Sequence, residues 1–417
     1  MAQYPSKSPH YEENKKAKKK CVLMYSGGLD TSICVHLLQE YYGYEVITLT
    51  IDVLQNEKDA QNMAEKAKKL GAIKSIVYDA KEEFAEQFAS QVIKANGMYD
   101  DKYPLGTSLA RPMQAKIATE VAIKEGAQAV AHGCKGRGAD AFRLNMTFNY
   151  MLPDNIKLVM PINDWWPTRQ EEVDYAYEKG IPVPVSQENP FSYDDNILSN
   201  AINYGSIDDI EQPAPEHAFK WTVPIEEAPD KAEELEIEFK QGLPVAINGE
   251  KMKLADMIFK LNILVGKHGI GRMDMIENGL YGNKFRWVYE APAAEVLIMA
   301  HVDLEKIVLP QQSLYFKHHV IDKKWTELAY KSFFYSPLCK SLMAFIDTMQ
   351  EYVNGSVTLK LYKGRAHIVK RKSDDSLIKL DPKDIVARED MDVVPYGFEE
   401  YSFASKHNEV VKSHFVK

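Results

Sequence analysis

The sequence predicts an α/β fold in which a parallel-sheet domain is followed by an α+β domain. From Cys21 to about Ile162, short apolar runs alternate with stretches of helical periodicity, which is typical of a parallel sheet covered by helices. Around 182–190 the chain is rich in proline and polar residues, as in a connection between domains. Beyond it, apolar and polar residues alternate in several runs, which indicates strands with one buried face.

The expected strands of the first domain are its short apolar runs. In chain order they are CVLMY (21–25), EVITLT (45–50), SIVYD (75–79), AQAVAHG (127–133) and KLVMPI (157–162). Helices are expected from Thr31, through 60–67 and from Pro112, because apolar residues recur there at helical spacing.

The second domain has a different layer arrangement. Its expected strands are ELEIEFK (234–240), VTLKLY (357–362) and AHIVKR (366–371), the last two turning around Gly364. The pair Asn248-Gly249 favours a tight hairpin. Helices are expected at 257–265, 325–334 and 338–353. The stretch 390–417 is apolar in places but too short for its own core, so we expect it to pack on something else.

Composition and charge exclude several classes of protein. The 417 residues carry a formal charge of −9, which removes the broad basic face that nucleic-acid binding requires. The four cysteines are dispersed without metal-ligand spacing, as in a reducing compartment. No apolar run reaches membrane-span length and the N-terminus has no signal-peptide core. We therefore expect a cytoplasmic protein with neither a nucleic-acid nor a membrane partner, and a flexible arm over residues 1–20.

The most informative stretch is MYSGGLDTS (24–32), placed where a buried strand ends and a helix begins. Two glycines let successive backbone N–H groups turn toward one anion, and the helix N-terminus adds partial positive charge. Ser26, Thr31 and Ser32 offer hydroxyl donors, while Asp30 offers an acceptor suited to magnesium. These residues favour a phosphate site, and a plain turn with an Asp-Thr helix cap is the alternative.

This loop differs from the GxxxxGK[ST] and GxGxxG motifs. It resembles the SGGxDS loop of the ATP pyrophosphatase family, which binds the pyrophosphate part of ATP. Other segments resemble argininosuccinate synthase, a member of that family, in the same order: YPLGTSLARP (103–112), HGCKGRGADAFRLN (132–145), ENPFSYDDN (188–196), GIGRMDMIENGLYGNKFRWVYEAPAA (269–294) and FIDTMQEYVNGSVTLKLYKGRA (345–366). The resemblance runs from about Cys21 to Lys372.

Physical chemistry leaves two interpretations open for most of these segments. GTSLARP suits a carboxylate site or a plain helix cap before a proline. The glycines of HGCKGRGAD allow close approach to a nucleotide or form a solvated loop, and Arg143 supplies a fork for a carboxylate. Glu277 and Tyr289, with Arg272 and Arg286, could equally form a surface ion-pair network.

The resemblance implies a division of the chain and a role for each matching residue. It implies an arm (1–20), a nucleotide-binding domain of the ATP pyrophosphatase type (21–185), a synthetase/multimerisation domain (186–385) and a C-terminal helical oligomerisation arm (386–417). The implied ATP-binding residues are Met24, Tyr25, Ser26, Gly27, Gly28, Leu29, Asp30, Thr31, Ser32, Ile51 and Gly133, of which Asp30, Ser26 and Ser32 are the catalytic ones. The implied citrulline-binding residues are Tyr103, Ser108, Arg143, Ser192, Glu277 and Tyr289. The implied aspartate-binding positions are Thr107, Lys135, Ala139 and Asp140. No protein metal site is implied beyond ATP with Mg²⁺.

Several substrate positions depart from the family's pattern. Lys135 and Ala139 stand where the family has threonine and asparagine, and Ala201 where it has a second citrulline-binding serine. The other departures are Asn203 for glutamate, Phe285 and Trp287 for serine and glycine, and Leu54 for glycine. They indicate either compensated drift, with Lys135 in water, or a shifted acceptor, with Lys135 binding a carboxylate by charge.

The resemblance implies a C–N ligase of arginine biosynthesis. The ureido oxygen of citrulline attacks the α-phosphorus of ATP, pyrophosphate leaves, and the amine of aspartate then displaces AMP, by positioning and charge neutralisation without a nucleophilic side chain. A homotetramer is implied. The alternatives are a ligase with a different ureido or amine substrate and a nucleotide-binding protein without catalysis. A tRNA-modifying enzyme is disfavoured by the acidic charge and dispersed cysteines, and a glutamine-dependent amidase by the lack of an amidotransferase segment.

Overall fold

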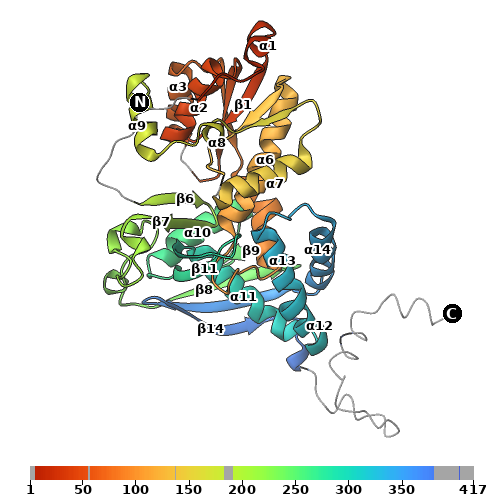
Figure 1. Ribbon diagram of the computed structural model, residues 1–417. Helices are drawn as coiled ribbons and strands as arrows, with labels where there is room; N and C mark the ends of the chain where they lie inside the picture. Colours follow the sequence, from red (N-terminus) through yellow and green to blue (C-terminus); the bar gives the residue numbers. More distant parts are fainter. Residues whose placement is uncertain (1–4, 55–56, 137, 183–190, 380–402, 404–417) are drawn as a thin grey trace, which may run out of the picture.

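The computed structural model describes residues 5–54, 57–136, 138–182, 191–379 and 403 (Figure 1). Most of the first half of the chain, red to yellow, forms the upper part of the molecule, and the second half, green to blue, forms the lower part. Helices α6 (Gly106–Glu125) and α7 (Ala139–Met151) lie where the two parts meet.

The upper part is built on a parallel sheet of five strands in the order β3-β2-β1-β4-β5. The strands are β1 (Lys20–Met24), β2 (Glu45–Asp52), β3 (Lys74–Asp79), β4 (Ala129–Ala131) and β5 (Lys157–Val159). All five expected strands are confirmed. The chain reverses its direction of strand addition between β1 and β4, and in such sheets ligands bind in the crevice at the carboxyl ends of these two strands.

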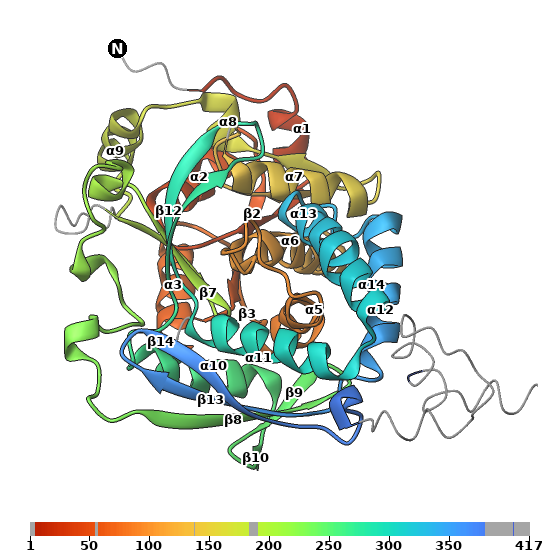
Figure 2. The ribbon, with the colours of Figure 1, turned by 90° about the horizontal axis from the view of Figure 1, so that it is seen from below.

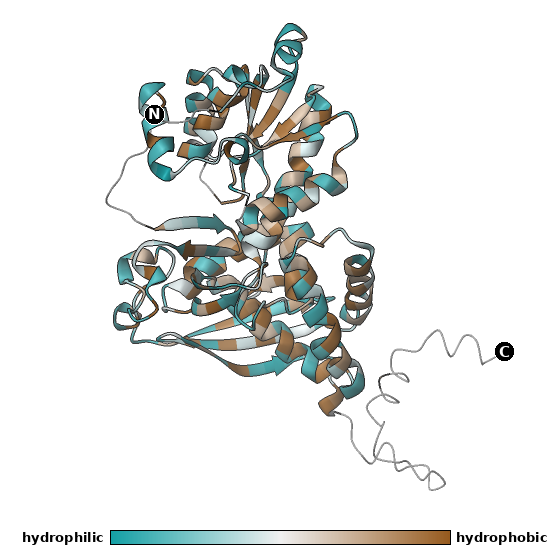
Figure 3. Ribbon diagram, viewed as in Figure 1, coloured by the Kyte–Doolittle hydropathy of each residue, from teal (hydrophilic) through white to brown (hydrophobic). Residues whose placement is uncertain are grey.

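Helices cover both faces of this sheet. Helix α6 and the helices α2 (Leu29–Glu40) and α3 (Glu57–Lys69) contact its strands, while α8 (Pro161–Trp165) and α9 (Arg169–Glu178) pack on α2 and α7 packs on α6. Helix α4 (Lys81–Phe84), the π-helical turn η1 (Ala85–Ala89) and α5 (Ser90–Lys94) pack mainly on the lower part of the molecule. Hydropathy colouring shows the parallel strands as mostly apolar, while α9 is mostly polar (Figure 3). Because helices cover a parallel sheet on both faces, its strands are apolar, whereas the helices keep a polar outer face.

Two expectations for this part are wrong. The helix expected from Pro112 starts at Gly106, after Leu105 in a left-handed conformation (φ +62°), so Pro112 lies inside it. The N-terminal arm is not free from residue 5 onward, because α1 (Tyr11–Lys16) packs on the domain. Tyr11 is buried and Asn14 Nδ2 donates to the Tyr42 carbonyl at 3.0 Å. The lysine-rich composition of residues 1–20 gave no sign of this packing, because only Tyr11 and Asn14 of α1 are buried.

The lower part contains two antiparallel sheets. One has the order β10-β9-β8-β13-β14, with β8 (Glu233–Lys240), β9 (Leu243–Ile247), β10 (Glu250–Lys251), β13 (Gly355–Tyr362) and β14 (Arg365–Lys372). The hairpin at Asn248-Gly249 is confirmed, since Ile247 pairs with Glu250 across it. The other sheet has the order β11-β12-β7-β6 and was not foreseen; its strands are β6 (Ser192–Asn196), β7 (Ser199–Asn203), β11 (Arg272–Asn278) and β12 (Lys284–Glu290).

Helices pack on these sheets and complete an α+β domain, as expected. Seen from below, α10 (Leu254–Gly266) and α11 (Pro292–Val308) lie along the first sheet (Figure 2). The other α- and π-helical elements described in this part are α12 (Gln311–Phe316), η5 (Lys317–Ile321), α13 (Asp322–Tyr330) and α14 (Pro337–Gln350). Short 3-10 turns lie at Gly205–Asp208, Glu216–Ala218, Ile225–Glu227 and Leu377–Lys379. The helices expected at 257–265, 325–334 and 338–353 correspond to α10, α13 and α14.

One hydrophobic core joins the two parts. The same cluster of buried side chains contains Val22 of β1, Leu109 of α6, Leu235 of β8 and Trp325 of α13. Because apolar packing is continuous from one sheet to the other, the two parts are held in a fixed relative geometry. The proline-rich connection 183–190 and the C-terminal arm expected over 386–417, apart from Phe403, lie outside the described residues.

Candidate active site

The loop between β1 and α2 leaves backbone N–H groups without partners in the helix. Gly27 has φ +74°, a conformation that favours glycine, and the extended Gly28 precedes α2 without a side-chain cap. The first backbone hydrogen bond of this helix runs from Ser32 N–H to the Gly28 carbonyl (3.0 Å). The preceding N–H groups, at the positive end of the helix dipole, are therefore available to an anion.

Side chains of the loop also bond to one another. Ser26 Oγ and Thr31 Oγ1 are 3.2 Å apart, and Tyr25 OH and Ser32 Oγ are 3.3 Å apart. Ser26 is exposed whereas Ser32 is buried, so of these two serines only Ser26 is accessible to a ligand in this structure. Met24 and Ile51, also expected near ATP, are half-buried at the ends of β1 and β2.

The turn after β4 lies directly against this loop. A Cβ added at Gly133 would come within 3.1 Å of Thr31 Cγ2 and 3.4 Å of Thr31 N, so glycine permits the close approach. Both loops occupy the crevice between β1 and β4. The structure thus brings together Gly133 and the 24–32 loop, at the place where α/β sheets bind nucleotides.

A chain of charges connects the two loops. Arg169 Nη1 lies 2.9 Å from Asp30 Oδ1 and 3.3 Å from Glu172 Oε2, and Lys135 Nζ lies 3.0 Å from Glu172 Oε1. Burial raises the pKa of Glu172, the nearby Asp30 raises it further, and Lys135 opposes both. Lys135 also donates to the Pro167 carbonyl at 3.2 Å, so its ammonium group has both a carboxylate and a carbonyl partner in this structure.

The acceptor end of the candidate site is a cluster of tyrosines around one carboxylate. Glu277 on β11 is buried and accepts hydrogen bonds from Tyr289 OH and Tyr330 OH, each at 2.5 Å. The Tyr103 and Tyr289 rings stack with centroids 4.5 Å apart, and Ser108 N donates to Tyr103 OH at 3.0 Å. Burial raises the pKa of Glu277, while the two tyrosine hydroxyls act to lower it. A desolvated carboxylate among aromatic faces is suited to bind an ammonium group.

A second carboxylate of this end lies between two arginines. Asp140 accepts from Arg111 at 2.9 Å and from Arg143 at 3.4 Å, and Arg111 also bonds Asp194 of β6. Burial acts to raise the pKa of Asp140, but the two guanidinium groups outweigh it and the pKa is lowered. Asp140 therefore stays ionised. Arg143 is buried, and its Nε donates to the Tyr330 carbonyl at 3.2 Å.

Three predicted residues are less closely tied to these clusters. Ser192 is exposed at the first position of β6, and Ala139 is the first residue of α7. Thr107 is buried in the first turn of α6, where its Oγ1 has no hydrogen-bond partner among the described residues.

Sequence reasoning missed four contributors: Arg111, Arg169, Asp194 and Tyr330. Arg111 and Asp194 lie within segments that carried the resemblance, so their charge next to predicted ligands was an available signal. Arg169 and Tyr330 come from helices with no motif, and only the tertiary fold brings them to the site.

Four of the seven departures from the family pattern, Ala201, Asn203, Phe285 and Trp287, lie on one face of the β6-β7-β12-β11 sheet. Ala201 is buried and pairs with Asp194 on one side and Tyr289 on the other. Trp287 stacks near Tyr289, with ring centroids 5.8 Å apart, and the exposed Phe285 pairs with Glu277. This face therefore presents aromatic rings and a methyl group where the family has smaller or hydroxyl-bearing residues. Asn203 pairs with Ser192 at the sheet edge, and Leu54 is half-buried after β2.

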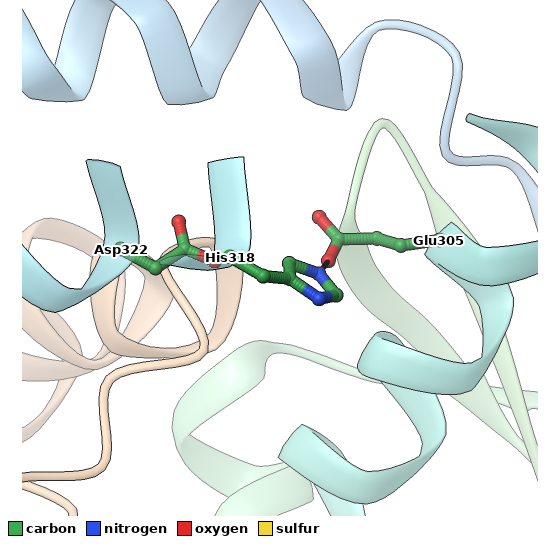
Figure 4. A group of neighbouring side chains, drawn as sticks. All are labelled: Glu305, His318 and Asp322. Carbon is green, nitrogen blue, oxygen red and sulfur yellow. Dashed lines mark hydrogen bonds and ion pairs between the residues drawn. The ribbon is translucent and has the colours of Figure 1, made fainter. Parts of the chain in front are cut away.

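A group with metal-ligand chemistry lies in the lower part, formed by Glu305, His318 and Asp322 (Figure 4). Its carboxylates already have a cation, because the buried Lys317 Nζ lies 3.0 Å from Glu305 Oε1 and 2.9 Å from both oxygens of Asp322. Asn96 Nδ2 donates to Glu305 Oε2 at 2.7 Å and to Asp322 Oδ2 at 3.0 Å. The arrangement is a buried ion-pair network. Separately, no helix in the described part of the chain is long and apolar enough to cross a membrane.

Comparisons with known proteins match each half of the chain to a domain family. Residues 20–182 match the arginosuccinate synthase N-terminal HUP domain, and residues 191–395 match the arginosuccinate synthase C-terminal domain. The argininosuccinate synthase of Pyrococcus furiosus is 49% identical, over 85% of this chain and 85% of its own. That of Symbiobacterium thermophilum is 46% identical, over 88% of this chain and 90% of its own.

A solved structure, the U34-tRNA thiolase NcsA of Methanococcus maripaludis, aligns at 18% identity and a TM-score of 0.29 over 40% of this chain and 60% of its own, which is too distant to carry a conclusion. Both domain families are matched in order, and relatives that approach half identity extend over most of the chain. The chain therefore belongs to the argininosuccinate synthase family.

Proposed function

We propose that this chain is an argininosuccinate synthase that joins citrulline to aspartate and converts ATP to AMP and pyrophosphate. The observation that carries this proposal is the pairing of an anion-binding loop at the β1–β4 crevice with a buried carboxylate-and-tyrosine cluster on β11 and β12. Family membership gives the reaction its identity, and the shared core holds the loop and the cluster in a fixed relative geometry.

In this proposal the 24–32 loop binds the phosphates of ATP. Its free N–H groups and the Ser26 hydroxyl stabilise negative charge as it grows on the departing pyrophosphate. Asp30 Oδ1 is bonded to Arg169, whereas Asp30 Oδ2 bonds none of the described residues, so that oxygen fits a Mg²⁺ ligand beside substrate phosphates. Magnesium would neutralise phosphate charge, and the protein would contribute one carboxylate to it.

Citrulline is proposed to bind through its amino-acid group at Glu277, Tyr289, Tyr103, Ser108, Arg143 and Ser192. Arg143 offers a buried fork for the carboxylate, and Glu277 offers a buried anion for the ammonium. With these groups held, the ureido oxygen can attack the α-phosphorus as pyrophosphate leaves, so that catalysis depends on orientation rather than on a protein nucleophile.

Aspartate is proposed to bind at Asp140, together with Thr107 and the turn that carries Lys135 and Ala139. Because its two arginines keep Asp140 ionised, this residue suits binding and orienting an amine better than accepting its proton. The amine then attacks the ureido carbon, loses a proton and displaces AMP.

A second candidate function, a ligase of the same family with a different acceptor substrate, is also supported by the structure. Ala139 and Ala201 offer no side-chain hydrogen bond, and Trp287 and Phe285 add aromatic surface on the face that carries Glu277. A ureido or amino substrate with a larger apolar part would fit this face better than the usual pair.

The test is a pyrophosphate-release assay over a panel of ureido and amino-acid partners. We expect AMP and pyrophosphate to form in equal amounts, only when citrulline and aspartate are both present, with argininosuccinate as the product. Faster turnover of another pair would replace the first proposal by the second, and pyrophosphate release with no acceptor dependence would contradict both.

Assembly and compartment are also proposals. A homotetramer is supported by family membership and by apolar side chains exposed on α12 and η5, namely Tyr315, Phe316 and Val320. A cytoplasmic location is supported by the four cysteines, all of which are free thiols.

A further inference from the structure

A lysine on α3 reaches the nucleotide loop from the side. Lys66 Nζ donates to the Gly27 carbonyl at 2.7 Å, and its side chain is partly buried. Met63, one helical turn earlier, lies 3.0 Å from where a Cβ on Gly27 would be, so α3 as a whole packs on the loop. Nothing in the motif 24–32 indicates this contact, because α3 lies more than 30 residues along the chain.

The charge of Lys66 is not balanced by a carboxylate. Within the described ranges, no Asp or Glu forms an ion pair with it, and burial lowers the pKa of its ammonium group. The other cations near the two loops differ in this respect, since Arg169 pairs with Asp30 and Glu172 and Lys135 pairs with Glu172. A partly desolvated ammonium needs an anion, and one of its three N–H donors is used by Gly27.

We infer that Lys66 binds the β- and γ-phosphates of ATP and the pyrophosphate formed from them. The inference rests on the proposed function of the 24–32 loop and adds to it a residue outside the motif. The hydrogen bond to the Gly27 carbonyl holds the Lys66 ammonium group against the loop that the proposed function assigns to the phosphates. The remaining N–H donors of Lys66 and its unpaired charge then meet the end of the triphosphate that becomes the leaving group.

A binding experiment distinguishes phosphate binding by Lys66 from a purely structural role of this residue. Inorganic pyrophosphate with Mg²⁺, and AMP, are titrated calorimetrically into the wild type, Lys66→Met and Lys66→Arg. Lys69→Met, which removes the same charge from an exposed position three residues along α3, is the matched control. Because neither titration requires turnover, the result can be read even if the wild type fails to join citrulline to aspartate.

Lys66→Met is expected to weaken pyrophosphate binding about 10- to 100-fold, the size of a lost charge-assisted hydrogen bond, with AMP binding within about twofold of the wild type. Lys66→Arg is expected to retain most of the affinity, and Lys69→Met all of it. The decrease of pyrophosphate affinity with added salt should also be shallower in Lys66→Met than in the wild type. Equal losses for pyrophosphate and AMP, an unchanged salt dependence, or full pyrophosphate affinity in Lys66→Met would each overturn the inference.

Discussion

At the scale of single residues, ion pairs hold the charged side chains of the candidate site in place. Asp140 is held between Arg111 and Arg143, and Lys135 is bonded to the buried Glu172. These pairs fix side chains near the acceptor before any substrate arrives, which reduces the ordering that binding must impose.

The two loop glycines should respond differently to substitution. A Cβ at Gly28 meets only Ser26 Oγ, at 3.5 Å, and its φ of −69° is open to any residue. Gly28→Val should therefore fold normally, as measured by its thermal unfolding midpoint, yet lose ATP turnover because the side chain blocks the loop amides. Gly27→Val should in addition lower the midpoint, since φ +74° strains a β-branched residue. Full activity in folded Gly28→Val would refute the assignment of this loop.

The turn that carries Lys135 and Ala139 gives a second prediction at this scale. Ala139→Asn restores an amide at the start of α7 and should lower the KM for aspartate about fivefold, the value of about 1 kcal/mol of hydrogen bonding. Lys135→Thr should instead lower thermal stability, because it removes one of the two cations paired with the buried Glu172. Steady-state kinetics and thermal unfolding of both variants check this. If Lys135 instead binds substrate, aspartate affinity in the wild type should fall as salt rises, and Lys135→Thr should lower the affinity and remove that salt dependence.

At the scale of elements, helix α6 and the β11–β12 hairpin carry most of the acceptor end. Tyr103 and Ser108 flank the start of α6, while Glu277 and Tyr289 come from the hairpin. The five parallel strands could be predicted because burial on both faces makes them continuous apolar runs. The hairpin could not, since RMDMIEN and KFRWVYE mix charged, apolar and aromatic residues, and the buried positions include the Glu277 carboxylate.

The π-helical turn η5 gives the prediction at this scale. It places the fully buried Lys317 among Glu305, Asp322 and the Lys94 carbonyl, which joins α11 and α13 to α5. Lys317→Met leaves two buried carboxylates without their cation, so the free energy of unfolding should fall by about 3–5 kcal/mol. Denaturant unfolding measures this, with the exposed Lys340→Met as control. A loss no larger than that of the control would show that the network does not stabilise the fold.

At the scale of the whole molecule, the two parts share one core and the proposed acceptor cluster spans the boundary between them. Tyr103 and Arg143 come from the upper part, and Glu277, Tyr289 and Tyr330 from the lower part. The resemblance could assign most of these residues to substrates one by one. It could not show that Tyr330 bonds Glu277 or that Arg111 bonds Asp140, because such contacts depend on how α6 and α13 pack rather than on local sequence.

Assembly supplies a further prediction at this scale. The stretch after Asp392 has apolar side chains at Tyr401, Phe403, Val411 and Phe415, which is unusual for a free tail. Removing the chain after Asp392 should lower the molar mass measured by light scattering below that of a tetramer, while the far-ultraviolet circular dichroism stays close to that of the full chain. A truncated protein that remains tetrameric would contradict the proposed role of the arm.

The central claim is that the ureido oxygen of citrulline becomes bonded to the α-phosphorus of ATP. The most direct measurement uses citrulline labelled with ¹⁸O in the ureido group, together with ATP and aspartate, followed by mass spectrometry of the products. Because that oxygen leaves with AMP when the amine attacks, AMP should carry one ¹⁸O atom and pyrophosphate none. Unlabelled AMP formed alongside argininosuccinate, or label in the pyrophosphate, would contradict the account.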